Sequence, residues 1–329
     1  MSKQYPGHVL FLNHFKRTSM NTVISAVFGF VLCLLVQNLF YTVPTMVTPT
    51  CPTVDKADVD RITSGRSYTD PDFSDCQDNK HPGYIPRYPR RRCASNNTYT
   101  DFGGTMTAKQ TARVNTCVLN FESDKKRELD LAIHDPSIRW SSHRYLNKSS
   151  FVIEAGGHNG LDVQELNSRY QPGTYVVLEP VKKFFHVLTK KFVSSPNVVV
   201  YNFGIDVSDG VFYMNDENND AASIFDKEQN KNNTESRIVN ATIFFEKMSV
   251  RKNDVDLITL NCEGCEYAVL DLLLSTDYIR HFRNIQFQPH NTQGICYSVQ
   301  RYCWYQELLR KTHRLTFQYK FIWESWSRI

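Results

Sequence analysis

The sequence lacks a strong charge bias, and this limits the partners that it suggests. Its 329 residues carry 38 Lys and Arg against 34 Asp and Glu. Without the three basic residues near the N-terminus (Lys3, Lys16 and Arg17), the balance is 35 against 34. Nucleic-acid-binding domains typically concentrate positive charge on one surface. The composition therefore predicts no nucleic-acid partner.

Charge is also absent from Val23 to Tyr41, a run about long enough to cross a bilayer, which takes roughly 20 residues. Basic residues precede the run, and the next charged residue after it is Asp55, so the positive-inside rule places the N-terminus in the cytosol. A cleaved signal peptide is the alternative, but no clean A-x-A site follows. We expect a single-pass type II membrane protein with a cytosolic tail (1–22), a signal anchor (23–41) and the remainder in the Golgi or ER lumen or at the cell surface.

Regular apolar periodicity is missing from residues 42–100, which are rich in Pro, Thr, Ser, Asp and Arg. This composition predicts a stem or linker. Its basic run near Arg90–Arg92 is a solvated linker, a protease site or a contact for an acidic glycan. Residues 101–329 form the expected lumenal domain. From about residue 151, short β-branched runs alternate with amphipathic stretches, which predicts an α/β sheet with helices on both faces.

Cysteines and glycosylation sequons agree with a lumenal location. Cys33 lies in the anchor, and an even number of cysteines follows it: Cys51, Cys76, Cys93, Cys117, Cys262, Cys265, Cys296 and Cys303. Four N-x-S/T sequons begin at Asn96, Asn147, Asn232 and Asn240. We therefore expect a glycoprotein with disulfide bonds, whose pairing the spacing does not reveal.

The first strand and turn, "FVIEAGGHNG", lack the dinucleotide motif GxGxxG because Ala155 occupies its first glycine position. The pattern is E-x-G-x-x-x-G, in which Glu154 precedes Gly156, Gly157 and Gly160. Glycines let the backbone approach a ligand, although a tight turn also uses them for steric reasons alone. An acid at this position is the usual arrangement for S-adenosylmethionine, whose sulfonium favours nearby negative charge.

Two further strands end in polar residues. "YVVLEP" ends in Glu179, nineteen residues after Gly160, and the helix-like "VKKFFHVLTKKF" follows. An acid at the tip of the second strand typically accepts hydrogen bonds from ribose hydroxyls. "NVVVYNFGIDVSDG" predicts a strand, a polar tip at Asn202 and Gly204, and then a turn.

The stretch "LNCEGCEYAVL" carries two cysteines and two carboxylates. Leu257–Leu260 reads as a strand and a helix is favoured from Glu266, so Glu263 lies on the turn at the carboxyl edge of the sheet, where ligands of α/β folds bind. No second pair at zinc-ribbon spacing accompanies the CxxC. Buried thiols or a disulfide are favoured over a redox or metal role, and no metal site is predicted.

Taken in order, "VIEAGGHNG", "VVLEP", "NFGIDVSDG" and "DLITLNCEGCEYAVL" resemble the FkbM-type methyltransferase family over about residues 151–329. The resemblance implies a class I methyltransferase fold, which is Rossmann-like with a doubly wound, mostly parallel, seven-stranded sheet. It also implies that S-adenosylmethionine is the cofactor and that a hydroxyl of a glycan or small metabolite is methylated.

The resemblance also assigns residues. Glu154, Gly156 and Gly160 match the family's first motif, Glu179 its ribose-binding acid, and Glu263, Gly264 and Glu266 its E-G-x-E motif. Asn202 and Asn261, after the third and fourth strands, join Gly157 among the expected cofactor-binding residues. Asn261 stands where the family commonly has Asp, and Thr259 where Lys is frequent.

Methyl transfer to an alcohol is an in-line displacement that requires removal of the hydroxyl proton. The candidate catalytic residues are Glu263, Glu266 and His290, with His158 as a further base. Both glutamates have a structural alternative as acids in the first turn of a helix, and His290 as the end of a strand. Two other functions remain open. The departure at Asn261 allows a catalytically inactive binding module. The anchor and stem are typical of glycosyltransferases, but the D-x-D sequence Asp254–Asp256 precedes a strand instead of following one.

Overall fold

The computed structural model describes residues 106–214, 234–291, 295 and 297–329. The expected tail, anchor and stem (1–22, 23–41 and 42–100) lie outside these residues. So do four cysteines and two sequons: Cys51, Cys76, Cys93, Cys296, Asn96 and Asn232. Among the described residues, no helix is both long enough and apolar enough to cross a bilayer.

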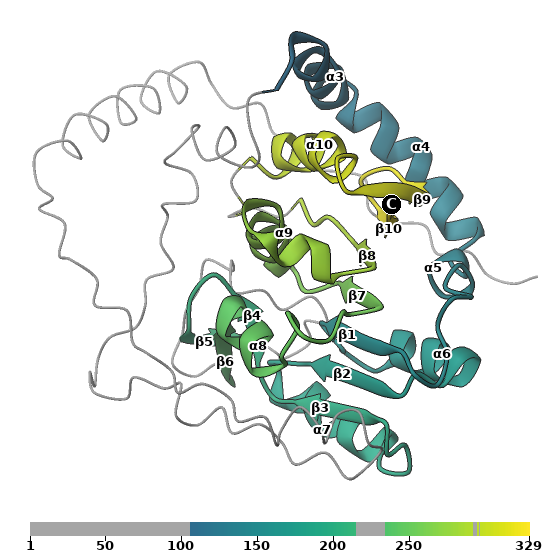
Figure 1. Cartoon of the computed structure of the whole chain (residues 1–329), viewed down its shortest axis with the longest axis vertical. Coiled ribbons are helices and arrows are strands. Elements are labelled where there is room, and N and C mark those ends of the chain that lie inside the picture. Colours follow the sequence, from purple (N-terminus) through teal and green to yellow (C-terminus); the bar gives the residue numbers. More distant parts are fainter. Residues whose placement is uncertain (1–105, 215–233, 292–294, 296) are drawn as a thin grey trace, which may run out of the picture. The chain divides into compact units, whose positions relative to one another are not determined.

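A seven-stranded sheet forms the centre of the domain, in the order β3-β2-β1-β7-β8-β10-β9. Its strands are β1 (Phe151–Ala155), β2 (Thr174–Leu178), β3 (Val198–Tyr201), β7 (Leu257–Leu260), β8 (Asn284–Phe287), β9 (His313–Tyr319) and β10 (Trp323–Arg328). The first five strands in this order (β3, β2, β1, β7 and β8) pair in parallel, and β10 is antiparallel to both β8 and β9. The predicted seven-stranded, mostly parallel, doubly wound sheet is thus confirmed (Figure 1).

Helices cover both faces of this sheet (Figure 1). They are α3 (Ala108–Leu119), α4 (Phe121–His134), α5 (Ile138–Ser141), α6 (Leu161–Tyr170), α7 (Lys182–Lys191), α8 (Ala241–Lys247), α9 (Cys265–Ser275), the 3-10 helix η4 (Asp277–His281) and α10 (Ser298–Leu309). The larger core includes Phe244 of α8, Leu270 of α9 and Tyr302 of α10. On the opposite face, Val163 of α6 and Leu188 of α7 pack in a second core. A disulfide between Cys117 and Cys303 joins α3 to α10.

Local sequence explains where these elements begin. Strands β2 (TYVVL) and β7 (LITL) are almost continuously apolar because parallel strands are buried on both faces. Helix α3 begins with a capping box between Thr107 and Gln110. Helix α8 is capped by Asn240, whose side chain accepts hydrogen bonds from the backbone N–H groups of Thr242 and Ile243.

Four buried polar side chains form one row across the sheet, which we call the polar row. Glu154 of β1 pairs with Thr259 of β7, Thr259 with Gln286 of β8, and Gln286 with Ser325 of β10. Each of the four is at most 2% exposed. One member of the row also contacts a side chain from outside the sheet, because Gln286 Oε1 lies 2.8 Å from Nε2 of the His143 imidazole.

A second sheet lies after β3, in the order β4-β6-β5. It comprises β4 (Gly204–Asp206), β5 (Gly210–Met214) and β6 (Thr234–Asn240). The sequence predicted a polar tip and then a turn in this stretch, but not the short strand β4 that lies between Asn202 and the bend at Val207 and Ser208. A three-residue strand is too short to show periodicity, and its parallel partner β6 follows only about thirty residues later.

Candidate functional site

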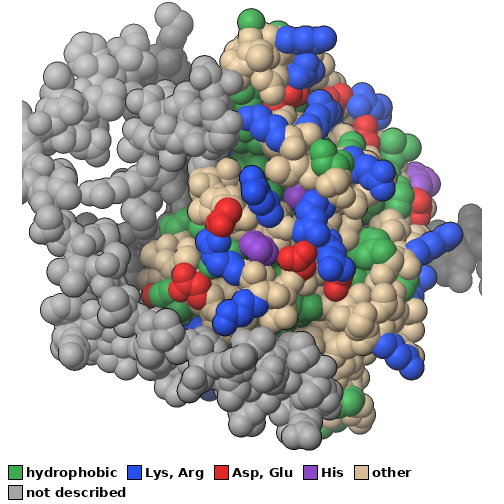
Figure 2. Space-filling model, viewed as in Figure 1, with side chains coloured by type: hydrophobic (Ala, Val, Ile, Leu, Met, Phe, Trp, Pro, Cys, Tyr) green, Lys and Arg blue, Asp and Glu red, His purple; other side chains and the backbone are tan. Residues whose placement is uncertain are grey.

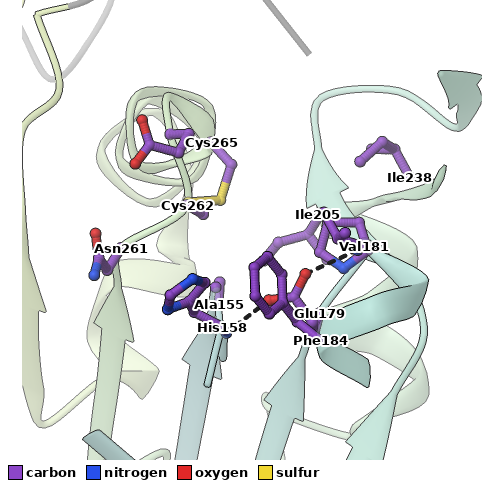
Figure 3. Close-up of a pocket in the computed structure, with 14 residues that line it drawn as sticks. Ala155, His158, Glu179, Val181, Phe184, Ile205, Ile238, Asn261, Cys262 and Cys265 are labelled. Carbon is purple, nitrogen blue, oxygen red and sulfur yellow. Dashed lines mark hydrogen bonds between the residues drawn. A yellow bond between two sulfur atoms is a disulfide. The ribbon is translucent and has the colours of Figure 1, made fainter. Parts of the chain in front are cut away.

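A pocket lies at the carboxyl edge of the main sheet, at the point where the strand order reverses between β1 and β7. Ala155 ends β1 and Gly156 follows it, Asn261 follows β7, and all three line the pocket. Glu179, after β2, lines the same pocket (Figure 3). This switch point is where open α/β sheets bind ligands. The pocket thus brings together Gly156, Glu179, Asn261 and Glu263, all expected from the sequence.

The glycine turn after β1 is shaped by close contacts. Gly156 has φ +93°, and a Cβ atom there would lie 1.9 Å from the backbone oxygen of Asn261. Its N–H donates to the carbonyl of Leu178 over 2.9 Å. Gly157 and Gly160 are packed against side chains, and neither lines the pocket. Only a glycine at 156 lets β1 and β7 lie this close at the pocket floor.

Glu179 is held rigidly by the backbone. Its Oε2 accepts the N–H of His158 over 2.7 Å, and its Oε1 accepts the N–H of Val181 over 2.8 Å. The side chain of Asn202 donates to the carbonyl of Glu179, so Asn202 braces this acid from outside the pocket. Burial raises the pKa of Glu179 to about 7, although both backbone N–H groups favour its charged form. Each carboxylate oxygen accepts up to two hydrogen bonds, which leaves capacity for a ligand.

Apolar side chains line the pocket beside Glu179. Val181 and Phe184 come from the start of α7, and Ile205 and Ile238 come from the second sheet (Figure 3). The His158 ring lies 4.2 Å from the Phe184 ring, centroid to centroid. This combination of a fixed carboxylate and apolar walls suits a nucleoside, which has a polar ribose and a flat base.

The loop between β7 and α9 forms the opposite wall. Glu263 has φ +54°, a conformation that is uncommon for a residue with a side chain, and Gly264 follows with φ +120°. Cys262 and Cys265 are joined by a disulfide (Figure 3), and both line the pocket. The favoured alternative for the CxxC pair, buried thiols or a disulfide, agrees with this geometry. Among the described residues, no group of three or more His, Cys, Asp or Glu is placed to hold a metal ion.

Glu263, His290 and Glu266 form one hydrogen-bonded cluster, which we call the Glu-His-Glu cluster. His290 Nε2 lies 3.1 Å from Glu263 Oε1, and His290 Nδ1 lies 3.1 Å from Glu266 Oε1. Glu266 is fully buried and also accepts the N–H groups of His290 and Gly264. Glu263 lines the pocket, and its side chain is 25% exposed. All three members were candidates from the sequence. In the structure, Glu263 lines the pocket, whereas His290 and Glu266 lie behind it and do not.

The charge state of His290 follows from this arrangement. Burial lowers the pKa of the imidazole, but the charge of Glu266 and the hydrogen bonds to Glu263 and Glu266 outweigh it and raise the pKa to about 10. His290 is therefore protonated at neutral pH. An imidazolium between two carboxylates orients them and is not itself able to accept a proton.

Glu154 lies apart from the pocket. Its carboxylate accepts a hydrogen bond from Tyr175 on the neighbouring strand β2, on the face covered by α5 and α6. Burial and the nearby charge of Asp162 raise the pKa of Glu154 well above its ordinary value. Glu154 does not line the pocket, so its expected role in binding the cofactor stays a prediction.

Sequence reasoning missed several residues of the pocket. Phe184 was available from the helical pattern after Glu179, but nothing distinguished it from a core residue. Ile205 and Ile238 had no signal, because the second sheet was not predicted.

Comparisons with known proteins give only distant likenesses. No protein-family model matches the chain, and no curated protein matches it. Among solved structures, the FkbM methyltransferase of Methylobacillus flagellatus KT is similar with 8% identity and a TM-score of 0.37, over 56% of this chain and 44% of that one. An O-methyltransferase of Bacillus cereus in complex with SAH has 11% identity and a TM-score of 0.32, over 70% of this chain and 96% of that one. The 23S rRNA methyltransferase ErmE has 12% identity and a TM-score of 0.32, over 59% and 66%.

These likenesses carry no argument about activity, so the proposals below rest on the chain's own residues. This chain spans less than half of the FkbM methyltransferase. One of the three similar structures is an rRNA methyltransferase by its description. On the face that Figure 2 shows, Lys and Arg side chains are spread among acidic and uncharged ones. The absence of a nucleic-acid partner stays a prediction.

Proposed function

We propose that the chain is an S-adenosylmethionine-dependent methyltransferase that methylates a hydroxyl group of a glycan or small metabolite. The observation that carries the proposal is the meeting of Glu179, the glycine turn and the Glu-His-Glu cluster at one switch-point pocket. Glu179 would hold the ribose hydroxyls, Gly156 would admit the cofactor to the pocket floor, and Phe184 and Ile238 would contact the base. When bound, S-adenosylmethionine supplies an electrophilic methyl group on a sulfonium.

The chain's own residues then have separate tasks. Glu263 lines the pocket and, as the general base, takes the proton of the acceptor hydroxyl. The His290 imidazolium orients Glu263 and compensates its charge, and Glu266 fixes His290 from behind. His290 and Glu266 are thus positioning residues, whereas the sequence offered both as catalytic. General bases contribute typically about 10²- to 10⁴-fold to a rate.

The alternatives have less support. Asp254 of the D-x-D sequence lies near the amino end of β7, away from the pocket, and contacts His281, Arg283 and Arg328. Its neighbour Asp256 accepts the N–H of Phe151. Both acids are engaged within the chain, so they do not offer the free metal-binding pair that a glycosyltransferase uses. The second alternative is a catalytically inactive binding module, which Asn261 suggests. An activity test distinguishes it from an enzyme.

The proposal includes a membrane anchor at 23–41 and a lumenal or cell-surface catalytic domain. In its support, the sequon at Asn147 lies on an exposed loop, and two disulfides suit an oxidising compartment. Digestion of intact microsomes with protease tests this topology. A protected domain is expected, and digestion of the domain from the cytosolic side would contradict it.

The experiment that tests the cofactor site is calorimetric titration of the full-length protein, in detergent, with S-adenosylmethionine and S-adenosylhomocysteine. Glu179→Gln should weaken binding strongly, because an amide cannot accept from two ribose hydroxyls and two backbone N–H groups. Glu165→Gln is the matched control, since Glu165 pairs with Arg169 on the surface of α6. Failure of the folded wild-type protein to bind either ligand would refute the proposal.

A further inference from the structure

The pocket wall contains a disulfide that encloses the proposed general base. Cys262 and Cys265 are joined to each other, and both line the pocket (Figure 3). The two residues between them are Glu263, which also lines the pocket, and Gly264. Glu263 therefore lies in a covalent ring of four residues, and the state of this one bond bears on the position of its carboxylate.

The backbone inside this ring has a conformation that a free chain rarely adopts. Glu263 has φ +54° and Gly264 has φ +120°, two positive values in succession. A positive φ costs about 1–3 kcal/mol at a residue with a side chain, so it persists only where surrounding bonds hold it. Within the ring, the N–H of Cys265 donates to the carbonyl of Cys262 over 3.4 Å, which is a long hydrogen bond. The closer constraints are the disulfide and the N–H of Gly264, which donates to Glu266 Oε2 over 2.9 Å.

One sulfur of the disulfide faces the buried carboxylate of the Glu-His-Glu cluster. Cys262 Sγ lies 3.5 Å from Glu266 Oε2. A disulfide sulfur has no hydrogen to donate, whereas the thiol that reduction produces has one. Reduced Cys262 can therefore donate to the same oxygen that accepts the N–H of Gly264. Reduction thus removes one constraint on the loop and offers Glu266 a competing donor in place of the other.

The second disulfide provides a matched comparison. Cys117 and Cys303 join α3 to α10, and neither lines the pocket. Each disulfide has one half-buried and one buried cysteine, so burial alone does not distinguish the two. They differ in place, because only the pocket disulfide encloses Glu263 and contacts Glu266.

We propose that the Cys262–Cys265 disulfide is a redox modification site that controls the pocket. Reduction by a dithiol opens the ring and releases Glu263 from His290, so the protein is competent when oxidised and switched off when reduced. An oxidising lumen, which we propose as the location of the domain, keeps the disulfide closed. The inference rests on the proposed function in one respect, because release of Glu263 stops methyl transfer only where Glu263 is the base.

The exchange step needs no group beyond the dithiol. A thiolate of the reductant attacks one sulfur of the pair, the S–S bond breaks, and the other cysteine leaves as a thiolate. The second thiol of the reductant then attacks the mixed disulfide and releases the first cysteine. The reductant ends as a disulfide, and two electrons and two protons pass from it to the cysteines, which end as thiols.

The test follows the pKa of His290 in the full-length protein with and without dithiothreitol. In the oxidised protein, the two carboxylates raise this pKa to about 10. Reduction should lower it part of the way towards 6.5, because Glu263 leaves its position 3.1 Å from Nε2 of the ring. Histidine-selective NMR titration measures the pKa, and alkylation followed by mass spectrometry identifies the cysteines that are reduced.

Two paired variants separate the pocket disulfide from the others. Cys262→Ala with Cys265→Ala should show the lowered pKa of His290 whether or not dithiothreitol is present. Cys117→Ala with Cys303→Ala is the matched control and should respond to dithiothreitol as the wild type does. The wild type with and without dithiothreitol gives the same comparison where a variant does not fold.

Three results would each overturn the inference. The first is an unchanged pKa of His290 once alkylation shows that Cys262 and Cys265 are reduced. The second is a response to dithiothreitol in the variant that lacks both of these cysteines, and the third is their alkylation without any reductant. Failure of the oxidised protein to bind S-adenosylmethionine or S-adenosylhomocysteine would refute the proposed function instead, and the titration of His290 would still report on the disulfide.

Discussion

Replacing Glu263 with Gln should lower the pKa of His290 while leaving the fold intact. The imidazole has a pKa of about 10 in the protein, against an ordinary value of 6.5, because two carboxylates outweigh its burial. Each carboxylate lies 3.1 Å from one ring nitrogen. The charge of the fully buried Glu266 contributes more to the rise than Glu263 does, so removal of the Glu263 charge should lower the pKa of His290 only part of the way towards 6.5. Glu263 is the better choice for this change because Glu266 also binds two backbone N–H groups.

The same change alters how stability depends on pH. A pKa that is raised in the folded state adds stability that is fully present below pH 6.5 and is lost as the pH rises through the folded pKa. Each pKa unit is worth about 1.4 kcal/mol, so wild-type protein should lose up to about 5 kcal/mol of unfolding free energy between pH 6.5 and 10 from this group. The Glu263→Gln variant should lose less stability over the same pH range, because its folded-state pKa is closer to 6.5.

Histidine-selective NMR titration measures the pKa directly, with His290→Gln to assign the signal among the ten histidines of the chain. Chemical denaturation at several pH values measures the stability. Glu165→Gln, remote on α6, should change neither quantity. A wild-type His290 that titrates near its ordinary pKa, or one unaffected by Glu263→Gln, would refute the charge assignment of the Glu-His-Glu cluster.

Three further outcomes follow from described contacts. Burial raises the pKa of Glu179 from 4.5 to about 7, so ionisation of this carboxyl destabilises the folded state as the pH rises from 4.5 to 7. In chemical denaturation over that range, the unfolding free energy of the wild type should fall by about 3 kcal/mol relative to that of Glu179→Gln. Gly156→Ala should destabilise by more than about 3 kcal/mol, because its Cβ meets backbone, and clearly more than Gly160→Ala, whose Cβ meets flexible side chains; equal thermal midpoints would contradict this. Endoglycosidase treatment should lower the apparent mass of the wild-type protein on a gel. Asn147→Gln should remove one glycan, because Asn147 is exposed, whereas Asn240→Gln should remove none, because the half-buried Asn240 side chain caps α8.

Much of the main sheet was predictable because its signals are local. Parallel strands buried on both faces read as apolar runs, and each is followed by a glycine or a polar residue that the sequence displays. The parallel strands β1, β2, β3, β7 and β8 were therefore found, whereas the number of seven strands was expected from the family resemblance. The second sheet was missed because β4 has three residues, and its pairing with β6 depends on contacts far apart in sequence.

The site was predicted in its parts but not in its arrangement. Glu179 and Glu263 were located from strand ends, since the carboxyl ends of parallel strands meet at one edge. The sequence did not show that Glu154 faces away from the pocket, because this depends on alternation along a strand buried on both sides. Nor did it show that His290 lies between two carboxylates, a fact that fixes its charge and thereby its role.

The polar row has a consequence for how the strands find one another. Glu154, Thr259, Gln286 and Ser325 align only when β1, β7, β8 and β10 pair in the observed register. Alternate residues of a strand point to opposite faces, so a slip of one position would push a polar side chain into the larger apolar core, where residues such as Ile258 and Ile285 now pack. Uniformly apolar parallel strands have little to distinguish one alignment from the next. The polar row therefore makes misaligned strand pairings less stable than the observed one, so that the sheet folds with a single register.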